Sequence, residues 1–458
     1  MTEVAGVGVG AGGAGGIGGV QWLTAAGNAG VGIPFRELVL VLLIACVTTY
    51  LTTGVARMLM VRFGQMSAPR ARDVHTVPTP RLGGVAMFTG LVVAVAAAGQ
   101  LPALNRGFPP VTPDMVAVLS AAVVIVVVGV IDDLYDISWV VKLGGQIVGS
   151  VVMSLSGLSW YLIWVPLGDG GTTLILDQVQ STMLTALLTV AIINAMNFVD
   201  GLDGLAAGLG MIGGGTLLVY SLTILHDQGG TVSAYPPAII SAVLVGVCAG
   251  FLPHNFAPAR IFMGDSGSML IGLLLAAACV SASGRINMAL YGTADVVALL
   301  SPLFVVAAAL SIPLLDLVLA VVRRLAAGKS PFAPDKKHLH HRLLRLGHSQ
   351  RQVVLVLYSW VGVVALGAVG ATVFPPVVAA VLFVVAFVVV GVVTWVPLVR
   401  NRPPHGGRHR SGQGGHGAGD AGPGGGAAGG AVEAPSAGGT DSPGPIAGLT
   451  APRDSLGG

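Results

Sequence analysis

The sequence is poor in charged residues, in aromatic residues and in cysteine. Charged residues make up 9% of its 458 positions and aromatic residues 6%, whereas about 25% of a soluble domain is charged. The three cysteines, Cys46, Cys248 and Cys279, all lie inside apolar runs, so neither a disulfide framework nor a cysteine zinc site is expected. The N-terminus also lacks the basic segment of a signal peptide. These absences exclude an ordinary soluble domain.

Long apolar runs take the place of the missing charge, since 54% of the residues are hydrophobic. The pattern predicts an all-α, polytopic integral membrane protein with about eleven transmembrane helices, because about 20 apolar residues cross a bilayer. The runs are 38–60, 85–101, 114–131, one that opens at Lys142, 179–196, 205–225, 237–252, 269–283, 296–322, 353–373 and 377–399. Aromatic, glycine and threonine residues at 159–177 predict an outer hairpin.

Two glycine-rich tails flank the apolar region. Residues 1–32 are predicted to be a flexible extension, residues 33–400 the transmembrane domain, and residues 401–458 a disordered tail. Of the 23 Lys and Arg residues, only Arg36, Arg106 and Arg285 fall in predicted outer segments. The positive-inside rule therefore predicts an outside N-terminus and a cytoplasmic C-terminus in the plasma membrane.

Carboxylates and amides gather at the cytoplasmic ends of the apolar runs. They are Asp132, Asp133, Asn197, Asp200, Asp203, Asn255 and Asp265. Asp200 and Asp203 are three apart, which predicts one shared helical face. A solvated helix end or a glycine turn would explain each cluster alone, but their recurrence on one face favours a single site. Clustered carboxylates of this kind bind Mg²⁺, which completes its shell with water and substrate phosphates.

A basic loop near the C-terminus supplies the opposite charge. It holds His338, His340, His341 and Arg342 among further Lys and Arg residues. One interpretation is phosphate recognition by these cations. A transition-metal site and attraction to anionic lipid headgroups are the alternatives. Carboxylates and cations on one membrane face together suggest phosphoryl chemistry on a lipid substrate.

These motifs, taken in order, resemble the polyprenyl-phosphate N-acetylhexosamine-1-phosphate transferase family. The matching segments are the Pro-Thr-Pro-Arg-Leu-Gly-Gly loop at 78–84, Asp132-Asp133, 197–204, 255–265 and the His-x-His-His segment at 338–341. The resemblance covers residues 38–399. It implies transfer of a sugar-1-phosphate from a UDP-sugar to a polyprenyl phosphate on cytoplasmic catalytic loops. The products are a polyprenyl-diphospho-sugar and UMP, and the cofactor is Mg²⁺, with Mn²⁺ as the alternative.

The resemblance also implies roles for individual residues. Metal ligation falls to Asp265, Asp133 and Asp203, and binding or deprotonation of the lipid phosphate to the Asp132-Asp133 pair. The implied catalytic residues are Asp132, Asp133, Asp200, Asp203, His338, His340 and His341. The implied substrate-binding residues are His75, Thr79, Arg81, Lys142, Asn197, Asn255, Phe262 and Arg342, with Phe262 stacking on uracil.

The histidine spacing resembles the WecA-like branch of the family, whereas three adjacent histidines would resemble the MraY-like branch. The expected sugar is therefore N-acetylglucosamine, and the Gly- and Ala-rich composition suits an actinobacterial member that uses decaprenyl or undecaprenyl phosphate. N-acetylmuramoyl-pentapeptide as the sugar and an ion-coupled transporter are the competing interpretations. The expected partners are the UDP-sugar, the lipid acceptor and membrane lipids, without nucleic acid. A direct displacement is predicted, with a covalent sugar-phosphate intermediate on an aspartate as the competing mechanism. Whether the chain forms a homodimer is left open.

Overall fold

The computed structural model describes residues 33–63, 79–165, 172–227, 234–284 and 349–400, with a few helical residues between 307 and 328. All of these belong to one compact unit, Met1–Arg402. The second unit, Pro403–Gly458, and the predicted extension at 1–32 lie outside the described residues. The domain bounds predicted for the two tails therefore stay predictions.

Ten long helices make up most of the described part of the chain. They are α2 (Phe35–Arg62), α3 (Gly83–Ala98), α4 (Asp114–Tyr135), α5 (Trp139–Leu155), α6 (Gln178–Val199), α7 (Leu205–Asp227), α8 (Tyr235–Asn255), α9 (Gly264–Gly284), α13 (Gln350–Val373) and α14 (Pro376–Arg400). Eight of them are long and apolar enough to cross a membrane, and α3 and α5 are shorter apolar helices. The predicted polytopic, helical membrane protein is thus confirmed.

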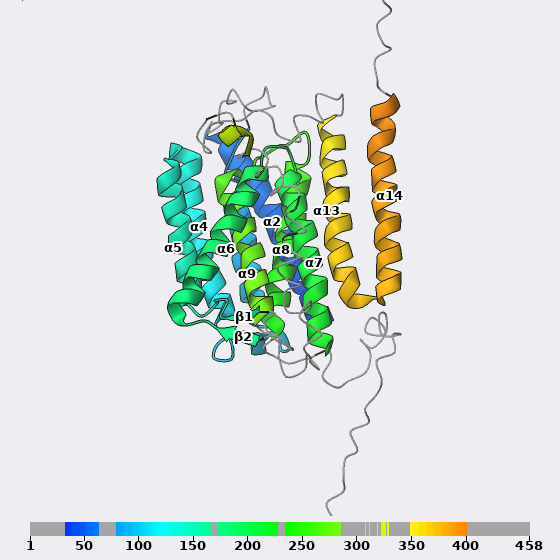
Figure 1. Cartoon of the computed structure of the whole chain (residues 1–458). Helices are drawn as coiled ribbons and strands as arrows, with labels where there is room; N and C mark the ends of the chain where they lie inside the picture. Colours follow the sequence, from blue (N-terminus) through cyan, green and yellow to red (C-terminus); the bar gives the residue numbers. More distant parts are fainter. Residues whose placement is uncertain are drawn as a thin grey trace, which may run out of the picture. The chain divides into compact units, whose positions relative to one another are not determined.

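Ten of the eleven predicted runs coincide with these helices. The remaining run, 296–322, falls almost wholly outside the described residues, so the count of eleven stays a prediction. The predicted hairpin is present as β1 (Leu162–Val165) and β2 (Thr172–Ile175), which pair antiparallel with Leu162 opposite Ile175. It lies at one end of the helices (Figure 1), and the side-chain hydroxyl of Thr185 on α6 anchors it by accepting from the backbone amide of Trp160 at 2.9 Å.

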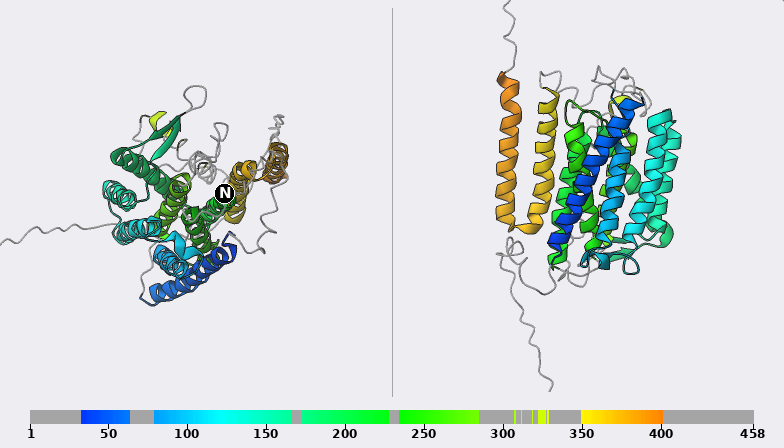
Figure 2. Two further views of the ribbon diagram at one scale, coloured as in Figure 1. Left: turned by 90° about the horizontal axis from the view of Figure 1, so that it is seen from below. Right: turned by 180° about the vertical axis from the view of Figure 1, so that it is seen from behind.

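Helix α9 is the centre of the arrangement, since it contacts α3, α4, α6, α7 and α8. Every residue of its apolar stretch is buried. On one side of it α4, α5 and α6 pack in succession, and on the other α13 packs on α7 and α14 on α13. The helices run side by side, with α14 at the edge (Figure 2). The site described below therefore depends on where α9 begins.

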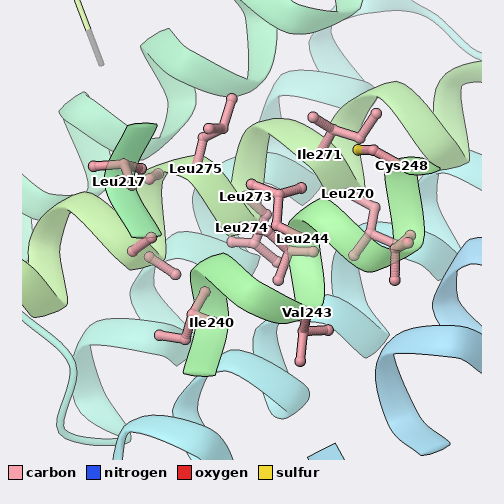
Figure 3. Close-up of a cluster of buried hydrophobic side chains, with 14 of the residues drawn as sticks. Leu217, Ile240, Val243, Leu244, Cys248, Leu270, Ile271, Leu273, Leu274 and Leu275 are labelled. Carbon is pink, nitrogen blue, oxygen red and sulfur yellow. The ribbon is translucent and has the colours of Figure 1, made fainter. Parts of the chain in front are cut away.

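Lipid tails are as apolar as leucine, so close packing rather than water exclusion holds such helices together. Figure 3 shows this packing where Leu217 of α7, Leu244 and Cys248 of α8, and Leu270 and Leu274 of α9 meet in one cluster. These buried side chains join α7, α8 and α9, each of which packs on the other two.

Helix α8 also lies directly on the backbone of α2. Gly246 and Gly250 are four residues apart, and a Cβ on either would overlap a carbonyl oxygen of α2, at Leu42 or Cys46. Small residues at this spacing let two membrane helices approach closely. The contact holds α8, whose C-terminal end supplies part of the site.

The structure corrects three predictions about the ends of the helices. Helix α6 stops at Val199, and residues 200–204 form a turn that ends in Gly204 at φ +80°. Asp200 and Asp203 therefore do not share a helical face, and that prediction was wrong because the glycines stop the helix. Helix α4 continues past residue 131 to Tyr135, so the Asp132-Asp133 pair lies in its last turn.

The third correction concerns the start of the run predicted at 269–283. Helix α9 begins earlier, at Gly264, and Asp265 is its second residue. Gly264 has a φ of +69°, which is open to glycine at little steric cost. Asp265 thus sits at a helix N-terminus, where the backbone amides point outward without helical partners.

Candidate active site

The site begins where two predicted motifs pair through their backbones. The amide of Phe262 donates to the carbonyl of Pro80 at 2.8 Å, and the amides of Gly83 and Gly84 donate back to Phe262 and Met263 at 3.0 and 2.9 Å. The loop before α3 and the loop before α9 are therefore held together by backbone hydrogen bonds. This pairing joins segments about 180 residues apart in sequence, a separation no local pattern predicts.

Asp133 holds the first turn of α9. Its Oδ1 accepts from the backbone amide of Asp265 at 2.7 Å, and its Oδ2 accepts from the amide and hydroxyl of Ser266 at 3.1 and 2.7 Å. The carboxylate thus satisfies helix amides that have no helical partner and complements the positive end of the helix dipole. Gly129 makes this approach close, because a Cβ there would overlap the Ser266 backbone.

Lys142, at the start of α5, lies between two carboxylates from different helices. Its Nζ donates to Asp132 Oδ2 at 3.1 Å and also contacts Asp265 Oδ2. Asp132 has a side chain only 8% exposed, whereas that of Asp265 is 31% exposed. The two carboxylates are therefore close enough to share one cation, and Asp265 is the more accessible of them.

Two asparagine side chains on α6 bind neighbouring helices, and one of them bonds the other carboxylate oxygen of Asp265. Asn197 Nδ2 donates to Asp265 Oδ1 at 2.6 Å and to Ser268 Oγ at 2.9 Å. One turn earlier, Asn194 Nδ2 donates to Oε1 of the fully buried Gln146 on α5 at 2.6 Å. These bonds tie α5, α6 and α9 together beneath the carboxylates, so Asp265 is oriented from several sides.

The turn after α6 is tied to the end of α8. Asp203 Oδ2 accepts from the backbone amide of Ala259 at 2.9 Å. The side-chain amide of Asn255 bonds the backbone through both of its polar atoms. Its Oδ1 accepts from the amide of Gly204 at 3.0 Å, and its Nδ2 donates to the carbonyl of Ile261 at 3.0 Å. Both side chains are almost fully buried. They shape the two loops around the site.

Asp200 caps the C-terminal end of α6 at the edge of this cluster. Burial raises its pKa well above the ordinary value of an aspartate, and the charges of Asp265, Asp133 and Asp203 raise the pKa further. The guanidinium of Arg81 opposes the rise. Asp200 is therefore within electrostatic reach of Asp265, Asp133 and Asp203.

The carboxylates of the site suit a hard cation that needs few protein ligands. Over the residues that the structure describes, no three His, Cys, Asp or Glu side chains form a complete ligand group. Mg²⁺ does not need one, because it is bound through one or two carboxylates and keeps water and phosphate oxygens. Asp265 and Asp132, already gathered around one lysine ammonium, fit that requirement.

The structure brings together most of the predicted residues it describes. Asp132, Asp133, Lys142, Asn197 and Asp265 are joined by the hydrogen bonds given above. Thr79 is buried, and Arg81 and Phe262 are half-buried at the paired loops. Five predicted residues lie outside the described part of the chain: His75, His338, His340, His341 and Arg342.

Sequence reasoning missed several residues that support the site. Gln146 and Ser268 bind the asparagines of α6, and Ser266 binds Asp133. The only sequence signal for the serines was the Gly-Asp-Ser-Gly-Ser segment, whose residue types are also typical of a turn. Gln146 had the signal of an amide inside an apolar run, where polar side chains are costly and functional.

Comparison with known proteins gives consistent matches. The family model described as glycosyl transferase family 4 matches residues 115–283. A protein of Mycobacterium tuberculosis named decaprenyl-phosphate N-acetylglucosaminephosphotransferase is 54% identical over 378 residues, which cover 82% of this chain and 93% of the relative. Its namesake in Mycolicibacterium smegmatis is 53% identical over 84% of this chain and 94% of the relative. An undecaprenyl-phosphate alpha-N-acetylglucosaminyl 1-phosphate transferase of Yersinia pestis is 31% identical over 74% and 86%.

Proposed function

The chain belongs to the family of polyprenyl-phosphate N-acetylglucosamine-1-phosphate transferases, and we propose that it transfers N-acetylglucosamine-1-phosphate from UDP-N-acetylglucosamine to a polyprenyl phosphate. The relatives named above act, by their names, on decaprenyl or undecaprenyl phosphate. The mycobacterial relatives are the more similar, so decaprenyl phosphate is the proposed acceptor. The same names favour N-acetylglucosamine over N-acetylmuramoyl-pentapeptide and a transferase over a transporter.

The observation that carries the proposal is the position of Asp265. It combines a helix N-terminus, a partly exposed carboxylate and a second carboxylate across Lys142. Helix N-termini and Mg²⁺ both favour phosphate oxygens. Asp265 and Asp132 are the proposed Mg²⁺ ligands, with Mn²⁺ as the alternative ion. Asp133 and Asp203, predicted as further ligands, already accept from backbone amides.

The proposed reaction is a direct displacement. An oxygen of the lipid phosphate attacks the sugar-linked phosphorus of the donor, the bond to the bridging oxygen breaks, and UMP leaves with that oxygen. A bound Mg²⁺ would offset the negative charge on the donor diphosphate. Asp132 is freer than Asp133 to reach the lipid phosphate, because its hydrogen-bond partner Lys142 is a side chain that can move, whereas Asp133 is held by backbone amides of α9. In this scheme the UDP-sugar is bound by Asp200, Asn197, Asn255 and Phe262, which form the donor side of the site.

The histidine loop completes the proposed site. His338, His340, His341 and Arg342, with His75 and Arg81, would neutralise the donor diphosphate and contact the sugar. The reaction takes place at the cytoplasmic face of the plasma membrane, with the N-terminus outside and the C-terminus inside, as the Lys and Arg distribution suggests. A homodimer stays a prediction.

A donor-competition assay tests the proposal. Membranes that contain the protein are incubated with labelled UDP-N-acetylglucosamine, Mg²⁺ and decaprenyl phosphate, and the labelled lipid is measured. Excess unlabelled UDP-N-acetylglucosamine should abolish the signal, whereas UDP-N-acetylmuramoyl-pentapeptide should leave it unchanged. Loss of the labelled lipid in the presence of excess UDP-N-acetylmuramoyl-pentapeptide would contradict the proposed sugar.

A further inference from the structure

Helix α13 contacts both loops in or beside which the donor-side residues lie, the turn after α6 and the loop between α8 and α9. The hydroxyl of Tyr358 donates to the carbonyl of Gly204, and Nε of Arg351 donates to the carbonyl of Ala257 at 2.7 Å. The first contact falls in the turn after α6 and the second in the loop before α9. The contacts cross 154 and 94 residues of sequence, and α13 lies beyond the segment that the family model matches.

The ring of Tyr358 sits in a notch on α7. A Cβ on Gly208 would overlap the ring and hydroxyl of Tyr358. Only a residue without a side chain lets the phenol lie so close to the α7 backbone, one turn from Gly204. The ring therefore lies against the Gly208 backbone while its hydroxyl bonds the Gly204 carbonyl.

Gly204 connects this contact to the acidic residues. Its carbonyl accepts from Tyr358, while its amide donates to Asn255 at 3.0 Å. The residue before it, Asp203, accepts from Ala259 at 2.9 Å. The two hydrogen bonds just given hold the turn against the loop, and their groups lie within one residue of Gly204 or two residues of Ala257, which α13 contacts.

The start of α13 is itself fixed. Ser349 and Gln352 form a reciprocal capping box, in which the Ser349 hydroxyl accepts from the Gln352 amide and the Gln352 side chain accepts from the Ser349 amide at 2.9 Å. Arg351 lies within this first turn. The guanidinium is thus presented to Ala257 from a stable helix end rather than from a loop.

We infer that α13 is a clamp, and that Tyr358 and Arg351 are positioning residues for the donor side of the site. Their hydrogen bonds to the carbonyls of Gly204 and Ala257 hold Asp203 and Asn255 in position. The inference rests on the proposed function, since it assigns these loops to the UDP-sugar.

Tyr358→Phe tests the clamp because it removes the hydroxyl and keeps the ring in the Gly208 notch. The KM for UDP-N-acetylglucosamine should rise at least about threefold, as expected for one lost hydrogen bond, with the KM for decaprenyl phosphate unchanged. Backbone amides in peptides 200–208 and 256–261 should exchange hydrogen faster. Arg351→Ala, at an exposed residue, should act in the same direction and keeps the test valid if Tyr358→Phe folds poorly.

The matched control is Ser359→Ala. It also removes a hydroxyl from α13, but Ser359 is exposed and donates only within its own helix, to Leu355 at 2.8 Å. It should change neither KM nor exchange. Unchanged exchange in both clamp variants overturns the clamp, and faster exchange with an unchanged donor KM overturns the positioning role. A wild-type protein without transferase activity would refute the proposed function, while the exchange data would still decide whether the clamp exists.

Discussion

The carboxylate of Asp133 accepts a hydrogen bond from the backbone amide of Asp265 at 2.7 Å. One acidic residue of the site is therefore the capping group that holds another in place. The family resemblance implied that Asp133 acts directly on substrate or metal, but the hydrogen bonds also give it a task at the start of α9. Substitutions at the two aspartates should consequently have different signatures.

Asp133→Asn should reduce turnover much more than UDP-sugar binding. An asparagine keeps one acceptor for the Asp265 amide, but its NH₂ group then faces the amide and hydroxyl of Ser266. The charged hydrogen bonds that are lost stabilise by about 1.5–3 kcal/mol, so thermal stability should fall as well. Turnover, donor Kd and the unfolding midpoint of the purified variant check this. A donor Kd that rises as much as turnover falls would contradict it.

Asp265→Asn should reduce turnover about 100-fold or more in a protein that still folds and inserts. Asparagine keeps the size but loses the charge that holds Mg²⁺, whose charge stabilisation is worth several kcal/mol. Asp136→Asn is the matched control, because Asp136 is an exposed carboxylate at the end of α4 with φ 52°, a conformation that asparagine tolerates. Activity is measured against Mg²⁺ concentration. Most of the activity surviving at low Mg²⁺ in Asp265→Asn would remove Asp265 from the metal site.

Lys142→Met should make the protein depend more on divalent cations for stability. Without the ammonium, Asp132 and Asp265 repel each other, and a proton or an added cation must offset the repulsion. The thermal midpoint in EDTA should fall, and Mg²⁺ should raise it more in the variant than in the wild type. Equal Mg²⁺ responses in the two proteins would show that the metal does not bind between these carboxylates.

The tails give a test of orientation. The Lys and Arg distribution predicts an outside N-terminus and an inside C-terminus. Single cysteines introduced into each tail are labelled in intact cells with a reagent that does not cross the membrane, and then again after lysis. The N-terminal cysteine should react in intact cells and the C-terminal one only after lysis. Labelling of the C-terminal cysteine from outside would contradict the eleven-span topology.

The spans were predictable because apolar length is a local property of the sequence. Helix α8, for example, follows from an apolar run bounded by a turn and a polar segment. The arrangement of the site depends instead on contacts between residues far apart in the sequence. The bond from Asp265 to Asp133 crosses 132 residues, and the one from Lys142 to Asp265 crosses 123. Sequence patterns named these residues as candidates, but only packing could show that Asp133 caps a helix and Lys142 bridges two carboxylates.

Helix ends were predicted less well for a related reason. The three-residue spacing of Asp200 and Asp203 predicts a shared face only if the helix continues, and the turn that ends in Gly204 stops it. Tyr358 had no sequence signal, since a tyrosine in an apolar run usually anchors a helix at the membrane interface. Its hydrogen bond to Gly204 depends on how α13 packs against α7, which no local pattern in the sequence predicts.

The central claim is a direct transfer of N-acetylglucosamine-1-phosphate to a lipid phosphate. The most direct measurement uses purified protein, Mg²⁺ and UDP-N-acetylglucosamine labelled in the sugar-linked phosphate. With decaprenyl phosphate present, labelled lipid and UMP should appear in equal amounts, and without it neither UMP nor labelled protein should form. Labelled phosphate attached to the protein in the absence of lipid, with UMP released, would contradict the account by revealing a covalent intermediate.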